Sequence, residues 1–165
     1  LYSVEIPEEG GDTLFADLEA IYESLPNEIK KCIDGRYYIS QYRWSVNRGD
    51  PESRWNMLTK EELMNTPAVE RPLVRTHPET GRKSLYIGMH TSHIEGISEI
   101  EGKNLLDELL EAATTSKNIY RHKWQSGDLV LWDNRCLLHR GDKNFKMDKH
   151  RRILHRTVVK GTVPF

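Results

Sequence analysis

The chain has 165 residues with a formal net charge of -1 at pH 7, and charged side chains make up 30% of it. This length suits one domain with a sizeable core, and the near-neutral charge argues against nucleic acid or a membrane surface as partners. Cys32 and Cys136 are the only cysteines, so we expect no disulfide framework and a cytoplasmic location. No apolar run reaches the roughly 18 residues that span a bilayer. Homo-oligomer formation stays open.

The first part of the chain predicts a strand followed by two helices. Leu1 to Ile6 alternates apolar and polar residues as a strand does, and the glycine pair at 10–11 suits the turn after it. Thr13 then stands near the start of a helix whose apolar residues recur at helical spacing. These residues are Leu14, Leu18, Ile21, Tyr22 and Leu25. Pro26 to Ile33 predicts a second short helix that starts with proline.

Secondary-structure signals are weak from Arg36 to Asn65, where aromatic residues are scattered among charges and turn formers. One hypothesis is an aromatic lid over a binding site, and the alternative is packing within an irregular insertion. The aromatic residues concerned are Tyr37, Tyr38, Tyr42, Trp44 and Trp55.

The second part predicts a hairpin, a helix and further strands. Pro72 to Thr76 and Ser84 to Gly88 are short apolar runs joined by H-P-E-T-G, whose proline and glycine suit a turn. We expect His77, in that turn, to be exposed. Ser98 to Ala113 has the spacing of an amphipathic helix. Three strands are then predicted, at Ile119–Trp124, Asp128–Trp132 and Arg151–Lys160.

This order of elements decides the fold class. Strands at both ends with helices inserted between them do not alternate as in a parallel α/β fold. The pattern predicts a mainly β fold with inserted helices, of the two-sheet jelly-roll type.

Two segments near the end of the chain carry chemistry. W-D-N-R-C-L-L-H-R-G runs from Trp132 to Gly141, and R-R-I-L-H-R-T-V-V-K-G runs from Arg151 to Gly161. On neighbouring strands they would place His139 beside two arginines. Arg152 and Arg156 would share one strand face about 13 Å apart, and arginine binds carboxylates bidentately. The arrangement suits a metal and a dicarboxylate side by side, although for the two arginines alone the default interpretation is an exposed pair on a strand surface.

The chain resembles the taurine and 2,4-dichlorophenoxyacetate dioxygenase family, whose members use Fe(II) and 2-oxoglutarate. The resemblance rests on G-G-D-T at 10–13, L-V-R-T-H-P-E-T-G-R-K-S-L-Y at 73–86, W-D-N-R at 132–135 and H-R-T at 155–157. These motifs follow the family order and cover nearly the whole chain. The resemblance implies a double-stranded β-helix, which is the jelly roll already predicted. It also implies hydroxylation of a small acidic substrate with dioxygen, releasing succinate and carbon dioxide.

The resemblance further implies roles for single residues at the metal and cosubstrate. His139 matches the distal iron-binding histidine, and it is therefore the candidate catalytic and metal-ligating residue. Arg152 matches the arginine that pairs with the remote carboxylate of 2-oxoglutarate, and Thr13 matches its hydroxyl partner. Trp132 matches an aromatic residue that lines the cosubstrate pocket.

Two more residues match substrate positions. Arg156 corresponds to the arginine that holds the substrate's acidic group in the taurine enzyme. A sulfonate, a sulfate ester or an aryloxyalkanoate would satisfy it equally well. His90 corresponds to a substrate-pocket residue, with a packed or solvated histidine as the alternative.

One part of the family pattern is missing. The family binds iron through an H-x-D or H-x-E pair together with the distal histidine, and the pair lies well upstream of the threonine. Here only twelve residues precede Thr13, and none is a histidine. We therefore expect residues 1–165 to be the C-terminal part of a single dioxygenase catalytic domain, with the jelly roll incomplete at its N-terminal side.

Two alternatives belong to other classes. His93 and Glu95 form an H-x-E of their own, which with His139 would give a different, cupin-like metal enzyme. Against this, the segment G-M-H-T-S-H-I-E-G matches the family stretch after the hairpin, which we interpret as a polar loop. The second alternative is a non-catalytic jelly-roll binding module that has lost its iron site. The joint presence of His139, Thr13 and the two arginines argues against it.

Overall fold

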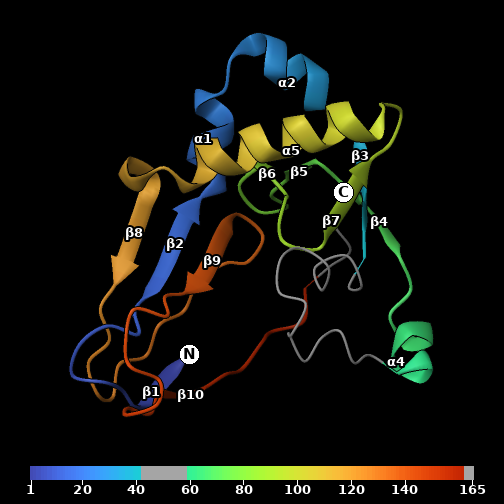
Figure 1. The fold of residues 1–165 in the computed structure, drawn as a ribbon. Coiled ribbons are helices and arrows are strands. Elements are labelled where there is room, and N and C mark those ends of the chain that lie inside the picture. Colours follow the sequence, from blue (N-terminus) through green and yellow to red (C-terminus); the bar gives the residue numbers. More distant parts are fainter. Residues whose placement is uncertain (42–58, 162–165) are drawn as a thin grey trace.

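The computed structural model describes residues 1–41 and 59–161, and these residues form small antiparallel sheets joined and covered by helices (Figure 1). The prediction of a mainly β fold with inserted helices is confirmed. Three of the aromatic residues considered for a lid lie outside the described residues. They are Tyr42, Trp44 and Trp55.

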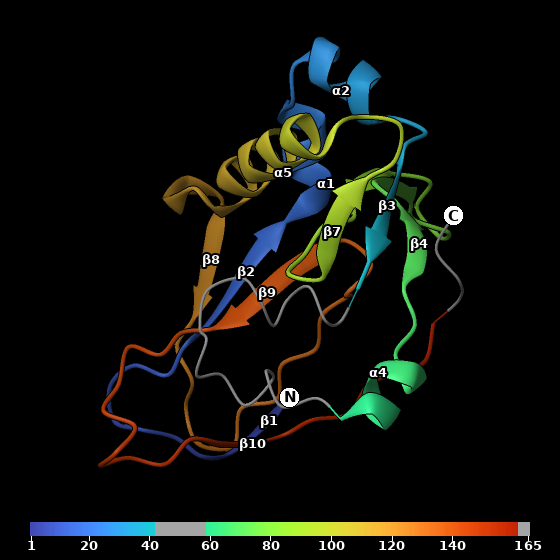
Figure 2. The same cartoon turned by 45° about the vertical axis from the view of Figure 1, so that its right-hand side comes forward.

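The sheet that carries most of the predicted site has β2 (Thr13–Asp17) as its central strand. Antiparallel partners flank it on both sides, β8 (Ile119–His122) and β9 (Leu137–Gly141) (Figure 2). The strand β8 was predicted closely, and β9 lies inside the W-D-N-R to H-R-G segment. Because β2 is central, Thr13 to Ala16 are buried, and only Asp17 at its end is exposed.

A second pairing joins the two ends of the chain. β1 (Tyr2–Glu5) pairs with β10 (Ile153–His155) in antiparallel fashion. The strand predicted at Arg151–Lys160 is therefore much shorter. We had expected it to lie next to β9, and this prediction is wrong, because its partner is β1. The strand predicted at Asp128–Trp132 is also wrong as a regular element. That segment instead hydrogen-bonds to residues 1–3 through isolated backbone contacts.

The remaining strands form a second three-stranded sheet and a hairpin. β3 (Tyr37–Ser40) lies between β4 (Val69–Pro72) and β7 (Thr91–Ile94). The hairpin of β5 (Val74–Thr76) and β6 (Lys83–Leu85) was predicted correctly. The polar loop predicted around His93 is wrong, because β7 occupies it. Thr91, Ser92 and Ile94 are buried on β7, with Ile94 in the main core, whereas His93 is exposed.

The helix predicted from Thr13 is half wrong. Residues 13–17 form β2, and α1 (Leu18–Ser24) begins only after Asp17. The Asp17 side chain explains the switch, because its Oδ1 accepts hydrogen bonds from the backbone N–H groups of Glu19 and Ala20 at 3.0 and 3.1 Å. An aspartate in this position satisfies the free N–H groups of a first helical turn.

The other helices agree better with the sequence. α2 (Asn27–Ile33) follows Pro26, and α5 (Glu99–Thr114) starts at Ser98 with a reciprocal capping box to Glu101. α4 (Lys60–Asn65) was not predicted. A short 3₁₀ turn, Ser116–Asn118, leads into β8.

The main core lies where α1 and α5 meet the hairpin and the β3–β7 sheet, and α5 runs across this region in both views (Figures 1 and 2). Its most deeply buried members are Ile33, Leu73, Leu85, Ile94, Leu106 and Leu109. None of the helices within the described ranges has the length and apolarity needed to cross a membrane.

Candidate functional site

One face of the β8–β2–β9 sheet gathers the predicted metal and cosubstrate residues. Thr13 and Phe15 lie two residues apart on β2, so both side chains point to the same face. His139 of β9 lies directly opposite Phe15 in the strand register. Side chains of directly opposed residues share a face. Thr13, Phe15 and His139 therefore occupy one surface.

His139 is held by aromatic rings. Its ring centroid lies 4.8 Å from that of Trp132 and 6.2 Å from that of Phe15, which it faces in a stacked arrangement. Phe15 and Trp132 meet edge to face at 5.2 Å. Within the described part of the chain, no side chain hydrogen-bonds to the His139 ring or forms an ion pair with it. Burial and then the positive charge of Arg156 lower the pKa of His139. A neutral imidazole is the form that binds a metal.

Thr13 and Arg152 meet as the sequence predicted. The Arg152 guanidinium donates from Nη2 to Thr13 Oγ1 at 3.1 Å and from Nε to the Gly11 carbonyl at 2.6 Å. The same hydroxyl accepts a hydrogen bond from Trp124 Nε1 at 3.0 Å. Burial lowers the pKa of Arg152, although the nearby Asp12 charge works in the opposite direction. A half-buried guanidinium of this kind favours an anionic partner.

Gly11 makes the approach of Arg152 possible. It adopts φ +70°, and a Cβ there would lie 3.0 Å from Pro7 Cγ and 3.1 Å from Arg152 Cδ. Any side chain at this position would therefore be strained and would crowd the guanidinium. This explains the second glycine of the G-G-D-T motif.

The Thr13–Arg152 pair and the His139 ring lie close together on this face. Thr13 and Phe15 are about 7 Å apart along β2, and Phe15 is the residue that faces His139. The hydroxyl and guanidinium at one end and the imidazole at the other are therefore separated by a distance that a five-carbon dicarboxylate can span.

Arg156 lies just past β10 and is exposed, on the wall of an open cavity of about 590 Å³. Trp132 lines the same cavity. After burial, the positive charge of Arg156 is the second cause of the lowered pKa of His139. The cavity connects the aromatic wall of the His139 site to an arginine that faces solvent.

His90 lies immediately before β7, beside the β4–β3–β7 sheet. It is half-buried, and burial followed by the charge of Arg71 lowers its pKa. Its backbone carbonyl accepts a hydrogen bond from Gln41 N at 2.9 Å. A substrate contact for His90 stays a prediction.

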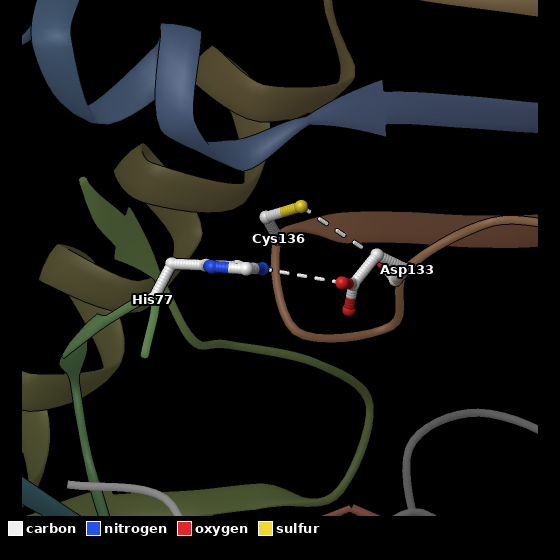
Figure 3. Close-up of side chains that lie close together, drawn as sticks. All are labelled: His77, Asp133 and Cys136. Carbon is white, nitrogen blue, oxygen red and sulfur yellow. Dashed lines mark hydrogen bonds and ion pairs between the residues drawn. The ribbon is translucent and has the colours of Figure 1, made fainter. Parts of the chain in front are cut away.

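The described residues hold a single cluster of three or more side chains with the spacing of metal ligands, and it is not the predicted one. It consists of His77, Asp133 and Cys136, whose candidate ligand atoms lie within 4.8 Å of one another (Figure 3). His93 and Glu95 are not grouped with His139 in this way, which removes the support for the cupin-like alternative. His139 is the candidate iron ligand that this chain itself provides.

Some important residues escaped sequence reasoning. His77 was expected to be exposed but is 5% exposed and hydrogen-bonds to Asp133, 56 residues away. Phe15 and Trp124, which support His139 and Thr13, were not singled out. Their signal was present in part, because an aromatic two residues after Thr13 on a strand must share its face.

Comparison with known proteins gives a consistent result. Residues 1–158 match the profile of the family described as "Taurine catabolism dioxygenase TauD, TfdA family". The alpha-ketoglutarate-dependent 2,4-dichlorophenoxyacetate dioxygenase of Burkholderia sp. (strain RASC) is 43% identical over 162 residues, which cover 96% of this chain and 52% of that protein. The enzyme of the same name from Cupriavidus pinatubonensis is 41% identical over 167 residues, covering 99% of this chain and 55% of that protein.

A solved structure is also similar. The crystal structure of AAD-2 in complex with Mn(II) and N-oxalylglycine aligns with a TM-score of 0.87 and 36% identity, over 99% of this chain and 62% of that one. The chain thus spans about half the length of the curated relatives it matches.

Proposed function

Since the chain belongs to the taurine catabolism dioxygenase TauD/TfdA family, we propose that it forms part of an Fe(II)- and 2-oxoglutarate-dependent dioxygenase. The reaction would hydroxylate a small acidic substrate with dioxygen and release succinate and carbon dioxide. One observation carries the proposal: the Thr13–Arg152 hydrogen bond lies on the same sheet face as His139, at a separation suited to a dicarboxylate.

We propose that residues 1–165 are the C-terminal part of a single catalytic domain. The support is that the chain spans about half of its relatives, which are 52% and 55% covered. Residues outside this sequence would then supply the H-x-D or H-x-E pair that joins His139. They would also supply the strands that complete a double-stranded β-helix from the small sheets described above.

In this scheme His139 would hold the iron through its neutral ring. Bound iron supplies the activation of dioxygen and the oxidation of a substrate C–H bond. Arg152 and Thr13 would bind the far carboxylate of 2-oxoglutarate, with two donors on the guanidinium and one hydroxyl. Phe15 and Trp132, whose rings contact that of His139, would hold its orientation and shield one side of it from water.

The substrate would be oriented by charge. Arg156 lines the 590 Å³ cavity beside Trp132 and is not committed to an ion pair with any described residue, so it can bind a carboxylate, sulfonate or sulfate group. His90 would contribute a further contact. The 2,4-dichlorophenoxyacetate acted on by the two named relatives is an aryloxyalkanoate, which makes that class the first to test.

The test is calorimetric titration of 2-oxoglutarate into the full-length enzyme loaded with Mn(II). We expect Arg152→Ala to weaken binding roughly ten- to a few hundredfold, because a charged hydrogen-bonded pair contributes on the order of 1.5–3 kcal/mol. Arg151→Ala is the matched control. Arg151 is adjacent and carries the same charge, but it is exposed, and its contact with Glu5 is an ion pair of 3.5 Å at the surface.

Arg156→Ala separates the two arginines. It should reduce turnover of the acidic substrate far more than it reduces 2-oxoglutarate affinity. Unchanged cosubstrate affinity in Arg152→Ala, or an equal loss in Arg151→Ala, would contradict the assignment of Arg152.

A further inference from the structure

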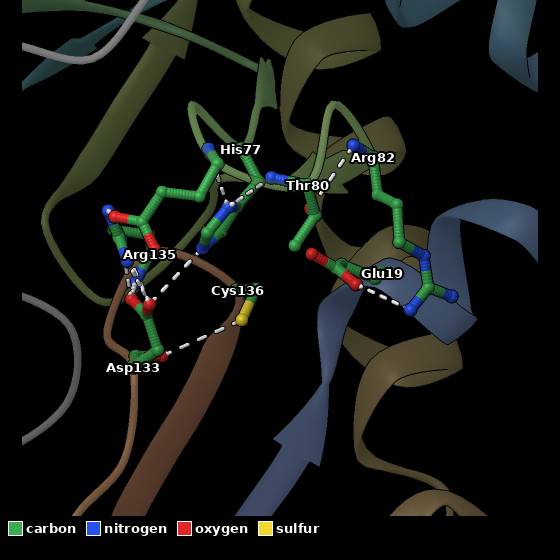
Figure 4. Close-up of polar contacts among 8 residues, drawn as sticks. Glu19, His77, Thr80, Arg82, Asp133, Arg135 and Cys136 are labelled. Carbon is green, nitrogen blue, oxygen red and sulfur yellow. Dashed lines mark hydrogen bonds and ion pairs between the residues drawn. The ribbon is translucent and has the colours of Figure 1, made fainter.

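The turn of the β5–β6 hairpin is tied to the loop before β9 by four polar side chains (Figure 4). His77 Nε2 lies 3.2 Å from Asp133 Oδ2, and Asp133 accepts hydrogen bonds from Arg135 through both oxygens. Arg135 Nη1 in turn donates to Glu79 Oε1 at 2.9 Å, which returns to the same hairpin turn. We call His77, Glu79, Asp133 and Arg135 the hairpin clamp. Its members form a closed ring of contacts between two segments more than 50 residues apart.

The hydrogen bonds of His77 fix its tautomer. Nδ1 faces the backbone N–H groups of Glu79 and Thr80, at 3.3 and 3.2 Å, and both of these can only donate. Nδ1 must therefore be the acceptor, without a hydrogen. In the neutral ring the hydrogen then lies on Nε2, which donates it to the Asp133 carboxylate.

The same geometry argues against a metal at His77, Asp133 and Cys136 (Figure 3). Ligation through Nε2 would require Nδ1 to carry the hydrogen, pointed at two N–H donors. Asp133 is already paired with Arg135, which lowers the pKa of the carboxyl group. Burial raises the pKa of the Cys136 thiol to about 11, and its Sγ contacts the Asp133 carbonyl at 3.9 Å. A protonated thiol is a poor metal ligand.

The hairpin turn itself is anchored to a helix. Arg82 Nη1 contacts the buried Glu19 carboxylate of α1 at 3.0 Å (Figure 4). The start of α1 also contacts the loop directly, since Leu18 N donates to the Cys136 carbonyl at 2.9 Å. The turn and the loop that the clamp connects are therefore each also tied to α1.

The loop held by the clamp connects Trp132 to β9, which carries the candidate metal ligand His139. Trp132 directly precedes Asp133, and the Asp133 carbonyl accepts a hydrogen bond from Leu137 N, the first residue of β9, at 3.1 Å. His139 follows two residues later. A shift of Asp133 would therefore move Trp132 relative to the His139 ring that it contacts.

We propose that His77 is a positioning residue that, as a fixed Nε2–H donor to Asp133, holds the loop between Trp132 and Leu137 and thereby orients His139. The expected effect of His77 on metal binding rests on the function proposed above. The tautomer of His77 and the contacts of the hairpin clamp do not depend on that function.

Two substitutions separate the role of Nδ1 from the role of Nε2 in the His77 imidazole. The amide of Asn reaches the place of Nδ1, so His77→Asn keeps an acceptor for the turn but loses the donor to Asp133. The amide of Gln reaches the place of Nε2, so His77→Gln keeps the donor to Asp133 but loses the turn bonds. His150→Asn and His150→Gln, at an exposed histidine, are the matched controls.

In the full-length enzyme labelled with ¹⁵N-histidine, we expect the NMR signals of His77 to show a protonated Nε2 and an unprotonated Nδ1. Mn(II) affinity measured by calorimetry should fall about tenfold in His77→Asn, at the lower end of losses caused by residues that orient metal ligands. His77→Gln should keep Mn(II) affinity within about twofold of the parent enzyme, although its midpoint of thermal unfolding should fall, because the turn loses its acceptor.

A hydrogen on Nδ1 would overturn the proposal. So would parent-like Mn(II) binding in His77→Asn, or equal losses in the Asn and Gln variants. Should His77→Asn fold poorly, Asp133→Ala removes the same contact from the other side, together with the hydrogen bonds from Arg135, and it should weaken Mn(II) binding by at least about tenfold. Failure of the parent enzyme to bind Mn(II) would contradict the proposed function, whereas the ring-nitrogen spectrum would still decide the tautomer.

Discussion

Among the described residues, the carboxylate of Asp133 accepts hydrogen bonds from the Arg135 guanidinium, from the Arg135 backbone N–H at 2.8 Å and from the His77 ring. The Arg135 hydrogen bond is the largest cause of the lowered pKa of Asp133, and burial opposes it. A carboxylate that is paired in this way stabilises the folded state only while it is ionised.

This gives a pH-dependent prediction for Asp133→Asn. The folded pKa lies below the unfolded value of about 3.9, so the stabilisation is fully present above that value and is lost as pH falls toward the folded pKa. We expect the variant to be less stable by on the order of 1–2 kcal/mol between pH 5 and 8. The difference should shrink below about pH 4.

Urea unfolding of the full-length enzyme across this pH range is the measurement. Asp107→Asn is the control, because Asp107 forms an exposed helical ion pair with Lys103 and should change stability by less than about 0.5 kcal/mol. A difference for Asp133→Asn that persists unchanged at pH 3.5 would contradict the role of its charge.

Single residues were predictable from sequence only where chemistry or a motif marked them. Thr13 and Arg152 were paired in advance, and the structure brings them to 3.1 Å. His77 was misjudged because its turn is polar and contains proline and glycine, which indicate an exposed loop. Its partner Asp133 is 56 residues away, and no local pattern shows such a contact.

At the scale of elements, the transition from β2 to α1 is the most informative difference from the sequence prediction. Leu14 and Leu18 are four residues apart and therefore fit a continuous helical stripe, yet only Leu18 is helical. The strand is favoured because β8 and β9 pair with both edges of residues 13–17. Such tertiary pairing outweighs local periodicity.

The cap at Asp17 should hold this boundary in place. We expect Asp17→Ala to reduce the free energy of unfolding by about 1 kcal/mol, because two backbone N–H groups lose their acceptor. Asp17→Ser retains an acceptor and should cost no more than a few tenths of a kcal/mol. Chemical denaturation measures both, and equal losses in the two variants would show that the cap is not the cause.

Strands of the second sheet were missed for a different reason. β3 (Tyr37–Ser40), β4 (Val69–Pro72) and β7 (Thr91–Ile94) are only four residues long each. A period of two cannot be recognised reliably in so short a run, particularly where polar residues such as Ser92 and His93 are included. The long helix α5, with its capping box, was predicted almost to the residue.

At the scale of the whole molecule, the structure forms small sheets of two or three strands rather than two large ones. Edge strands with unpaired backbone groups need partners. The proposed upstream strands would pair with them, and they would bring the remaining iron ligands to His139. The family could be predicted from motifs, whereas the extent of the sheets could not, because pairing between strands far apart in the sequence leaves no local pattern.

The central claim is that His139 is an iron ligand of a 2-oxoglutarate-dependent dioxygenase, and succinate formation tests it most directly. Full-length enzyme supplied with Fe(II), 2-oxoglutarate, dioxygen and an aryloxyalkanoate should form succinate. His139→Ala should reduce the rate at least about a hundredfold, since a facial site cannot lose a ligand without losing metal. His155→Ala, at an exposed histidine of β10, should leave the rate unchanged. Undiminished succinate formation in His139→Ala would contradict the account.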